Sequence, residues 1–394
     1  MLAFRRRLLL EGKALTLAAA LNEPGLAFDA RDMSASVKGH TTNFDGDANS
    51  LFTYSSPSTK YIRVASGLYL PGTTMRCEFD AVGAALGLSI EEQRTTLAKR
   101  SRRLDDGTDW TRSNVTASTV TGVDGVSGSA TRLTATANNA TALGATNTSA
   151  SAARRLAPFV RRVAGTGNIE WTLDGGSTWT AFAGLTSSWQ RLDVGATVTN
   201  PRVGFRIVSN GDSVDVDFAN GETGSNATSP IESTASQVTR AADNITLAVS
   251  AFPYAQATWT VDAWVNDAAA GGDRIIWSMD TGIETRRANP FRSAAGLAAA
   301  YLNGATGGSG SAVLDNQNVG AGAFKQAIAY AVDDAAGVTN GGTPATDNSL
   351  TLGAFTTLRL GQSYAAATLL NGHLKTLRFV PRRRPNAELQ SITA

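Results

Sequence analysis

The chain has 394 residues, of which 42% are hydrophobic and 17% are charged, and its 35 basic and 33 acidic side chains give a formal net charge of +2. This length fits two or three domains with packed cores, whereas the balanced charge argues against an extended basic surface for nucleic acid. A single cysteine excludes an intrachain disulfide, and no segment has the roughly 20 apolar residues that membrane insertion requires.

The residue types favour an antiparallel β protein that is not an enzyme. Thr and Val favour half-buried strands, and the abundant Gly, Asn and Asp favour the turns between them. With two histidines and one cysteine, a zinc site would need an unusual ligand set. Histidine-dependent nucleophilic catalysis would have to use one of two histidines that lie in no recognisable setting.

Residues 1–25 are predicted to form a short helical leader. Charged residues interrupt its apolar run, and the second apolar stretch, residues 14–21, is short and is followed by Glu23 and Pro24. An export signal has a longer uninterrupted apolar segment. We therefore expect an attachment element and no signal peptide.

Residues 26–103 contain short strand-like runs separated by turns, such as Lys60–Val64 and Met75–Phe79. No long helical periodicity is visible there. The pattern predicts an irregular, β-containing linker or collar domain.

Residues 104–228 form the first clear module. Ile169–Leu173 and Thr178–Phe182 alternate in polarity and flank an Asp-Gly-Gly turn, which is typical of a β-hairpin. Further short strands follow with turn signals every 8–12 residues, as in sandwiches and barrels. A Thr-, Ser- and Asn-rich connection, residues 224–236, marks the boundary after this module.

Residues 237–394 form the second module. Ala257–Val265 and His373–Phe379 have strand character, and a short helix is expected at Pro385–Ile392. The sequence thus predicts an all-β chain of two jelly-roll-type β-sandwich modules, with the helical leader and the irregular linker region before them.

Three phrases of the sequence resemble those of virion surface proteins from tailed phages, prophages or phage-like particles. They are Gly87–Leu97 (GLSIEEQRTTL), Thr228–Ile231 (TSPI) and Val238–Asp243 (VTRAAD). In these proteins a module similar to carbohydrate-binding modules follows the first phrase. Thr96 departs from the pattern, which has asparagine at this position.

The second module resembles a concanavalin-like or laminin-G-like domain. The likeness lies in Trp259–Val265, Trp277–Met279 and Gly372–Phe379, and in the strand-to-helix ending that closes the chain. Together the two resemblances cover residues 85–394.

The resemblance implies a fibre, spike or appendage on the virion surface, attached to other virion proteins through its N-terminal region. It also implies a homotrimer that binds host cell-surface polysaccharide for adsorption, with avidity supplied by many copies. No nucleic-acid partner and no membrane insertion are expected. A purely structural role in decorating the capsid or tail is an alternative. A capsular polysaccharide depolymerase is a second alternative, but the sequence selects no carboxylate pair for hydrolysis.

Sugar-binding sandwiches use exposed aromatic side chains as platforms for pyranose rings. The candidates in the first module are Trp110, Trp171, Trp179 and Trp189. Core packing is the more common role for any one tryptophan, and the sequence does not decide which of the four are exposed.

Four carboxylates of the first module are candidates for a structural Ca²⁺ site: Asp212, Asp215, Asp217 and Glu222. Asp215 and Asp217 lie two apart on a predicted strand and therefore share one face, and carboxylate oxygens are the ligands that Ca²⁺ prefers. The alternative is a solvated strand face. No other cofactor is expected.

Overall fold

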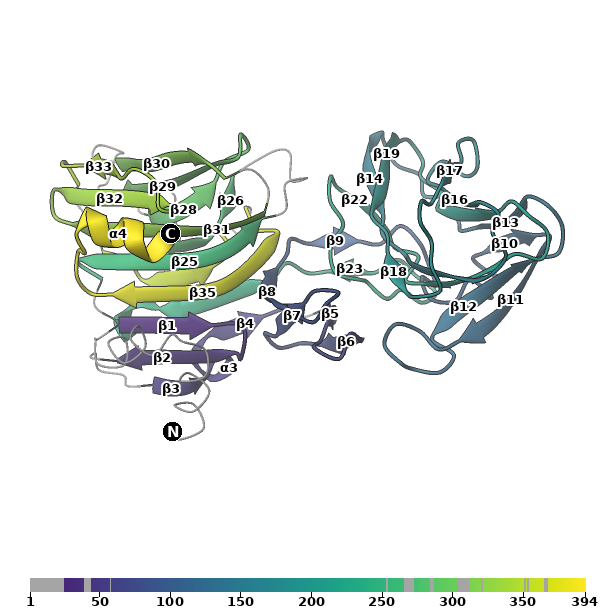
Figure 1. Ribbon diagram of the computed structural model, residues 1–394, viewed down its shortest axis with the longest axis horizontal. Coiled ribbons are helices and arrows are strands. Elements are labelled where there is room, and N and C mark those ends of the chain that lie inside the picture. Colours follow the sequence, from purple (N-terminus) through teal and green to yellow (C-terminus); the bar gives the residue numbers. More distant parts are fainter. Residues whose placement is uncertain are drawn as a thin grey trace. The chain divides into compact units, whose positions relative to one another are not determined.

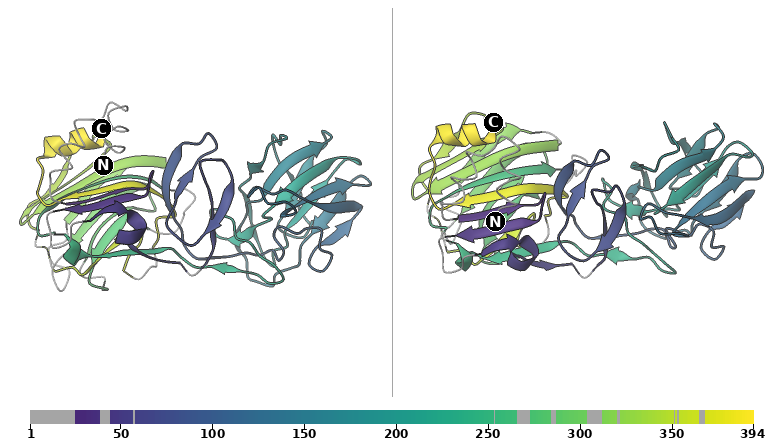
Figure 2. Two further views of the ribbon diagram at one scale, coloured as in Figure 1. Left: turned by 90° about the horizontal axis from the view of Figure 1, so that it is seen from below. Right: turned by 60° about the horizontal axis from the view of Figure 1, so that its bottom comes forward.

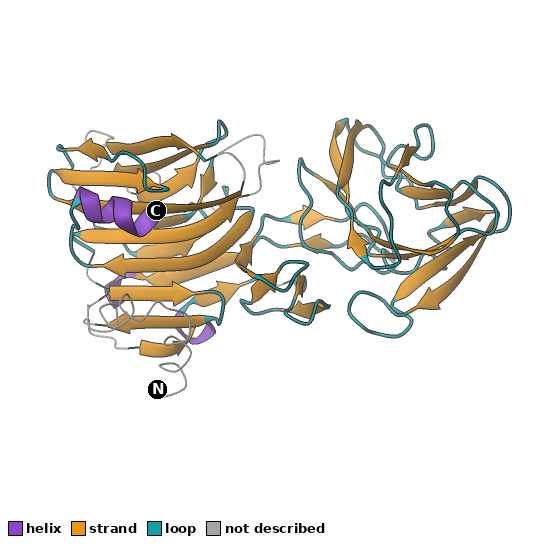
Figure 3. Cartoon of the chain, in the orientation of Figure 1, coloured by secondary structure: helices purple, strands orange, loops and turns teal. Residues whose placement is uncertain are grey.

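The structure is a computed structural model that describes residues 25–38, 44–56, 58–252, 254–265, 273–283, 287–303, 312–319, 322–350, 352, 354–364 and 368–394. Apart from Gly25, the predicted leader (1–25) lies outside the described residues. The chain divides into two compact units. The central unit is Ser55–Asp243, and the discontinuous unit combines the described residues up to Tyr54 with those from Asn244 onward. Strands dominate both units (Figure 3), so the predicted all-β class is confirmed.

A β-sandwich of two antiparallel sheets forms most of the central unit (Figure 1). The first sheet has, in spatial order, β10 (Thr111–Ser113), β13 (Ala140–Leu143), β20 (Gly204–Ile207), β16 (Ile169–Thr172) and β17 (Thr180–Ala181). The second has β11 (Val115–Val120), β12 (Ala130–Ala135), β21 (Ser213–Asp217), β15 (Phe159–Ala164) and β18 (Gln190–Arg191).

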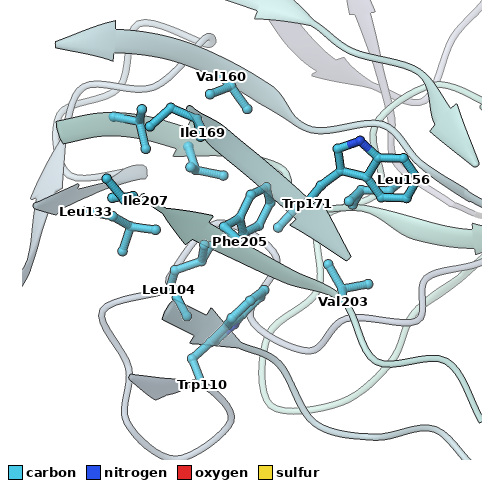
Figure 4. Packing of buried hydrophobic residues seen from close by; sticks show 14 of the residues in the cluster. Leu104, Trp110, Leu133, Leu156, Val160, Ile169, Trp171, Val203, Phe205 and Ile207 are labelled. Atoms are coloured by element: carbon cyan, nitrogen blue, oxygen red, sulfur yellow. The ribbon is translucent and has the colours of Figure 1, made fainter. Parts of the chain in front are cut away.

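The core of this sandwich comes from the alternation of side chains along its strands. Successive residues of a strand point to opposite faces, so Leu133 of β12 and both Val214 and Val216 of β21 enter one buried cluster. Phe205 and Ile207 of β20 enter the same cluster from the first sheet. Figure 4 shows these apolar side chains converging between the strands. The face of each sheet turned away from this cluster is its outer face.

The predicted Asp-Gly-Gly hairpin is present. β16 pairs with β17, with Trp171 opposite Thr180. At the turn, Gly175 and Gly176 have φ angles of +73° and +97°, which side chains other than glycine rarely allow.

Smaller antiparallel sheets flank the sandwich. Their strands are β14 (Ala152–Leu156), β19 (Val194–Val198) and β22 (Gly221–Thr223); β9 (Arg94–Thr95) and β23 (Thr239–Arg240); β5 (Lys60–Arg63) and β6 (Tyr69–Gly72); and β7 (Cys77–Phe79) and β8 (Ala85–Ile90). Tyr61 and Tyr69 of the β5–β6 hairpin contact Phe218 and Phe159, with ring centroids 4.8 and 4.5 Å apart. The hairpin therefore covers part of the outer face of the second sheet.

The discontinuous unit also contains two large antiparallel sheets. One has the order β3 (Phe44–Asp47), β2 (Ser34–Lys38), β1 (Gly25–Asp29), β35 (Gly372–Val380), β25 (Ala257–Val265), β31 (Gly322–Ala331), β32 (Asp334–Thr339) and β33 (Ala345–Asp347). The other has β30 (Ala312–Asn318), β29 (Leu297–Asn303), β28 (Arg287–Arg292), β27 (Trp277–Asp280), β34 (Thr357–Leu360), β24 (Asn244–Ala248) and β4 (Thr53–Ser55), with β26 (Arg274–Ile275) paired to β28.

Aromatic rings join these two sheets. Trp259 of β25 stacks on Trp277 of β27 with centroids 4.3 Å apart, and Phe252 and Phe379 pack against Trp259. On the opposite side of the β31–β32 pair, helix α4 (Asn386–Thr393) buries Leu389, as Figure 2 illustrates. This helix confirms the one expected near the end of the chain. Short helical turns α3 (Ala48–Leu51) and η1 (Val249–Ala251) complete the described elements. No helix in the described ranges is long and apolar enough to span a bilayer.

The boundaries of the predicted domains need correction. The predicted linker, residues 26–103, is split between the two units. Its first strand belongs to the discontinuous unit, because Leu26 and Phe28 pair with Phe379 and Leu377 of β35 and are buried there. The predicted first module, 104–228, forms one compact unit with the flanking residues from Ser55 to Asp243, and the predicted second module, 237–394, begins at Asn244 and includes β1–β3.

Candidate functional site

Two of the four candidate tryptophans belong to the core of the central sandwich. Trp110 is 1% exposed, and its indole N–H donates to the carbonyl of Lys99 at 3.1 Å. Trp171 is 9% exposed and lies in the same cluster. The prediction of a sugar platform is therefore wrong for both, because sandwich packing buries their rings (Figure 4).

The other two candidates lie half-buried on the outer faces, each against an arginine. The guanidinium of Arg161 lies over the ring of Trp189, 4.5 Å from its centroid. That of Arg206 lies over Trp179 at 4.8 Å. A cation over an indole face is attracted by the electron-rich ring, so both tryptophans are held in fixed positions while part of each ring meets solvent.

A line of polar side chains crosses the outer face of the second sheet. Ser118 of β11 stands opposite Arg132 of β12, Arg132 opposite Asp215 of β21, and Asp215 opposite Arg161 of β15. Trp189, which directly precedes β18, contacts Arg161 at the end of this line. We call these five residues the charged row.

Asp215 holds the charged row together. It is fully buried, and its Oδ1 accepts from Nε of Arg132 at 2.7 Å while its Oδ2 accepts from Nε of Arg161 at 2.8 Å. The hydrogen bond to Asp215 raises the pKa of Arg132. Both arginines also use Nη2 for this carboxylate, at 3.1 and 2.8 Å. Two cations therefore share one anion, and the row has a formal charge of +1.

The side chains of both arginines remain accessible. Their exposed fractions are 37% for Arg132 and 29% for Arg161, against 0% for Asp215. Among the described residues, the hydrogen bonds of these two side chains involve Nε and Nη2. Their Nη1 groups are thus donors available to a ligand.

A comparable line crosses the outer face of the first sheet but has balanced charge. Ser113, Thr141, Arg206 and Glu170 stand opposite one another on β10, β13, β20 and β16. Nε and Nη2 of Arg206 bond to the Glu170 carboxylate. With Trp179 under the guanidinium, these residues form what we call the balanced row. Its one cation and one anion leave no excess charge.

The predicted calcium ligands do not converge. Oδ2 of Asp212 accepts from the Gly167 N–H at 2.7 Å. Both oxygens of Glu222 accept from Thr228, one from its N–H at 2.9 Å and one from its hydroxyl at 2.7 Å. Burial raises the pKa of Glu222. Within the described part of the chain, no group of three or more His, Cys, Asp or Glu side chains is arranged to hold a metal.

Asp215 and Asp217 do share one face of β21, as predicted, but arginines occupy both. Asp217 is fully buried and receives two bonds from Arg102, at 2.8 and 3.0 Å. Burial raises the pKa of Asp217, and Arg102 opposes that effect. The solvated-face alternative is therefore also wrong for these two residues. The described residues do not fit a Ca²⁺ ion at this position.

The phrases that carry the virion resemblance form a buried ion network in the central unit. Lys60 lies 3.2 Å from Glu91 and 2.8 Å from Asp243, and Arg240 lies 3.4 Å from Glu91. Ser229 donates to both oxygens of Glu91 at 2.7 and 2.6 Å. Although burial opposes ionisation, Lys60, Arg240 and Ser229 together hold the pKa of Glu91 well below its usual range. This network connects β5, the Gly87–Leu97 phrase and the 228–243 segment.

The sequence matches no protein-family model and no curated protein. Among solved structures, the chain is similar to the CBM40 of the Ruminococcus gnavus IT-sialidase, with 15% identity and a TM-score of 0.31 over 36% of this chain and 84% of that chain. It is also similar to domains LG4-5 of the mouse laminin α1 chain, with 9% identity and a TM-score of 0.24 over 64% and 93%. A tail fibre protein from an E. coli phage gives 9% and 0.19 over 73% and 39%.

Proposed function

We propose that this chain is a non-enzymatic glycan-binding protein on the surface of a tailed-phage or phage-like particle, and that the charged row of the central unit contacts the sugar. The observation that carries the proposal is the row itself. It places a partly exposed tryptophan, two arginines with available donors and the exposed Ser118 along one sheet face. Indole surface packs against sugar C–H groups, and donors of this kind bond to sugar oxygens.

Replacing Trp189 with alanine is expected to lower the affinity for the glycan about tenfold, which corresponds to about 1.4 kcal/mol. The reason is that the indole supplies the apolar contact of the row and positions Arg161. Binding of the full chain to an array of bacterial surface polysaccharides measures this effect. Trp189→Phe keeps a ring at the position and should retain part of the affinity.

Trp179→Ala is the matched control, because Trp179 is also half-buried against an arginine but belongs to the balanced row. It should keep the wild-type affinity. Because Trp189 also packs against a buried aromatic cluster, the thermal midpoint of each variant is measured in parallel. Wild-type binding by a folded Trp189→Ala protein would remove the charged row as the site.

A purely structural role predicts a different set of results. The wild-type chain would then bind no polysaccharide on the array and no host cells, while antibody to the chain would still label the particle. Such labelling in electron micrographs also tests the surface location and separates head from tail. A depolymerase would release reducing ends from host capsule, and we expect no such release.

A further inference from the structure

We infer that the charged row selects glycans that carry carboxylates, such as polymers containing uronic acids. This inference rests on the proposed glycan-binding function and names the substrate class of the same site. Its basis is the unequal charge of the row, in which Arg132 and Arg161 share Asp215 as their anion. An acidic sugar would supply the second anion.

The geometry of the two guanidinium groups suits a carboxylate. Arg132 and Arg161 project from β12 and β15, the two strands that flank β21, and both already grip one carboxylate with paired N–H groups. The planar guanidinium matches a carboxylate in this way, whereas a lysine ammonium acts as a point charge. Asp215 is fully buried, so it fixes the two guanidinium groups from below and leaves their exposed sides to a ligand.

The neighbouring side chains do not cancel the positive charge. The adjoining line on the same face contains Thr116, Thr134 and Ser213, which stand opposite one another on β11, β12 and β21 and are uncharged. On the other side of the row, Asp217 is occupied by Arg102. The hydroxyls of this adjoining line are available for sugar hydroxyl groups.

The balanced row provides an internal comparison. Arg206 has Glu170 as its own partner, so a carboxylate ligand there would meet a neutral pair. A polyanion drawn to any arginine would use both faces, whereas selection by excess charge uses the charged row. The two faces of one sandwich therefore distinguish specific recognition from general electrostatic attraction.

The test compares one uronic-acid polysaccharide with the same polymer after its carboxyl groups have been reduced to alcohols. The full wild-type chain should bind the acidic form at least about tenfold more tightly, as expected for charge-assisted hydrogen bonds, and this preference should weaken as salt is added. Arg132→Gln and Arg161→Gln should each lose most of the preference. Arg206→Gln is the control variant and should keep it.

Several outcomes would overturn the inference. Equal binding of the two polymers by wild type would remove the acidic selectivity and leave the proposed glycan binding intact, whereas binding of neither polymer nor any array glycan would remove the proposed function itself. Preference retained in folded Arg132→Gln and Arg161→Gln would also contradict it. If either glutamine variant fails to fold, Arg132→Lys keeps the charge and removes the paired donors. An unchanged preference in that variant would refute recognition by the fork, and a reduced one supports it. A sulfated polymer preferred over the uronic-acid polymer would overturn the assignment to carboxylates.

Discussion

Replacing Glu91 with glutamine is expected to lower the free energy of unfolding of the central unit by about 3–5 kcal/mol, the usual effect of removing one partner from a buried ion pair. Glu91 is the carboxylate next to Arg240, whose side chain is 1% exposed. Glutamine would leave that guanidinium without an anion in a buried position. Lys60 would keep Asp243 as its partner.

Denaturant unfolding of the full chain, followed by a signal from the central unit, measures this change. Glu92→Gln is the matched control, since the adjacent side chain is 25% exposed and pairs with Arg94 at the surface. Such a pair contributes about 0–1 kcal/mol. Similar losses in the two variants would mean that the buried network does not stabilise the unit.

The effect of Glu91→Gln should also depend on pH. The pKa of Glu91 is lower in the folded protein than in the unfolded chain, so its ionisation stabilises the fold above about pH 4.5 and this contribution declines as the pH falls below that value. The gap in stability between wild type and Glu91→Gln should therefore shrink in acid. A gap that widens in acid would contradict the direction of the pKa shift.

Trp110→Ala should destabilise the central unit by about 3–5 kcal/mol, as expected for deleting a large side chain from a packed core. The ring of Trp110 is 1% exposed and stacks near Phe205, with centroids 6.3 Å apart. Its removal leaves a cavity and also leaves the Lys99 carbonyl without this donor.

The same denaturant experiment measures the loss, and Trp179→Ala on the outer face is the control with the same change of residue type. Its loss should be clearly smaller because Trp179 is only half-buried. If Trp110→Ala instead left stability unchanged and abolished glycan binding, the ring would be a binding platform and its assignment to the core would be wrong.

Local pattern was sufficient to predict the fold class but not the domain boundaries. The hairpin at Asp174–Gly176 and the alternation in β21 depend on neighbours in the sequence, so they could be read directly. The pairing of Leu26 with Phe379 could not. Nothing in the residues around Leu26 specifies a partner strand near the other end of the chain, and strand pairing depends on tertiary packing.

The candidate site was predicted in part for the same reason. Alternation correctly placed Asp215 on the outer face, but its partners lie 83 and 54 residues away in sequence, at Arg132 and Arg161. Identifying them requires the spatial order β12-β21-β15, which is not the order of the chain. Trp110 was misassigned because it directly precedes β10, where strand alternation gives no information about direction.

The division of the discontinuous unit has a consequence for how the protein is made. A ribosome adding about 5–20 residues per second reaches Phe379 roughly 18–70 s after Leu26, so β1 waits that long for β35. All of Ser55–Asp243 emerges in between. We expect the central unit to fold on the ribosome first, while residues 25–38 stay unpaired and sensitive to protease. Ribosome-bound chains stalled before and after residue 380 would reveal this order, and early protection of residues 25–38 would contradict it.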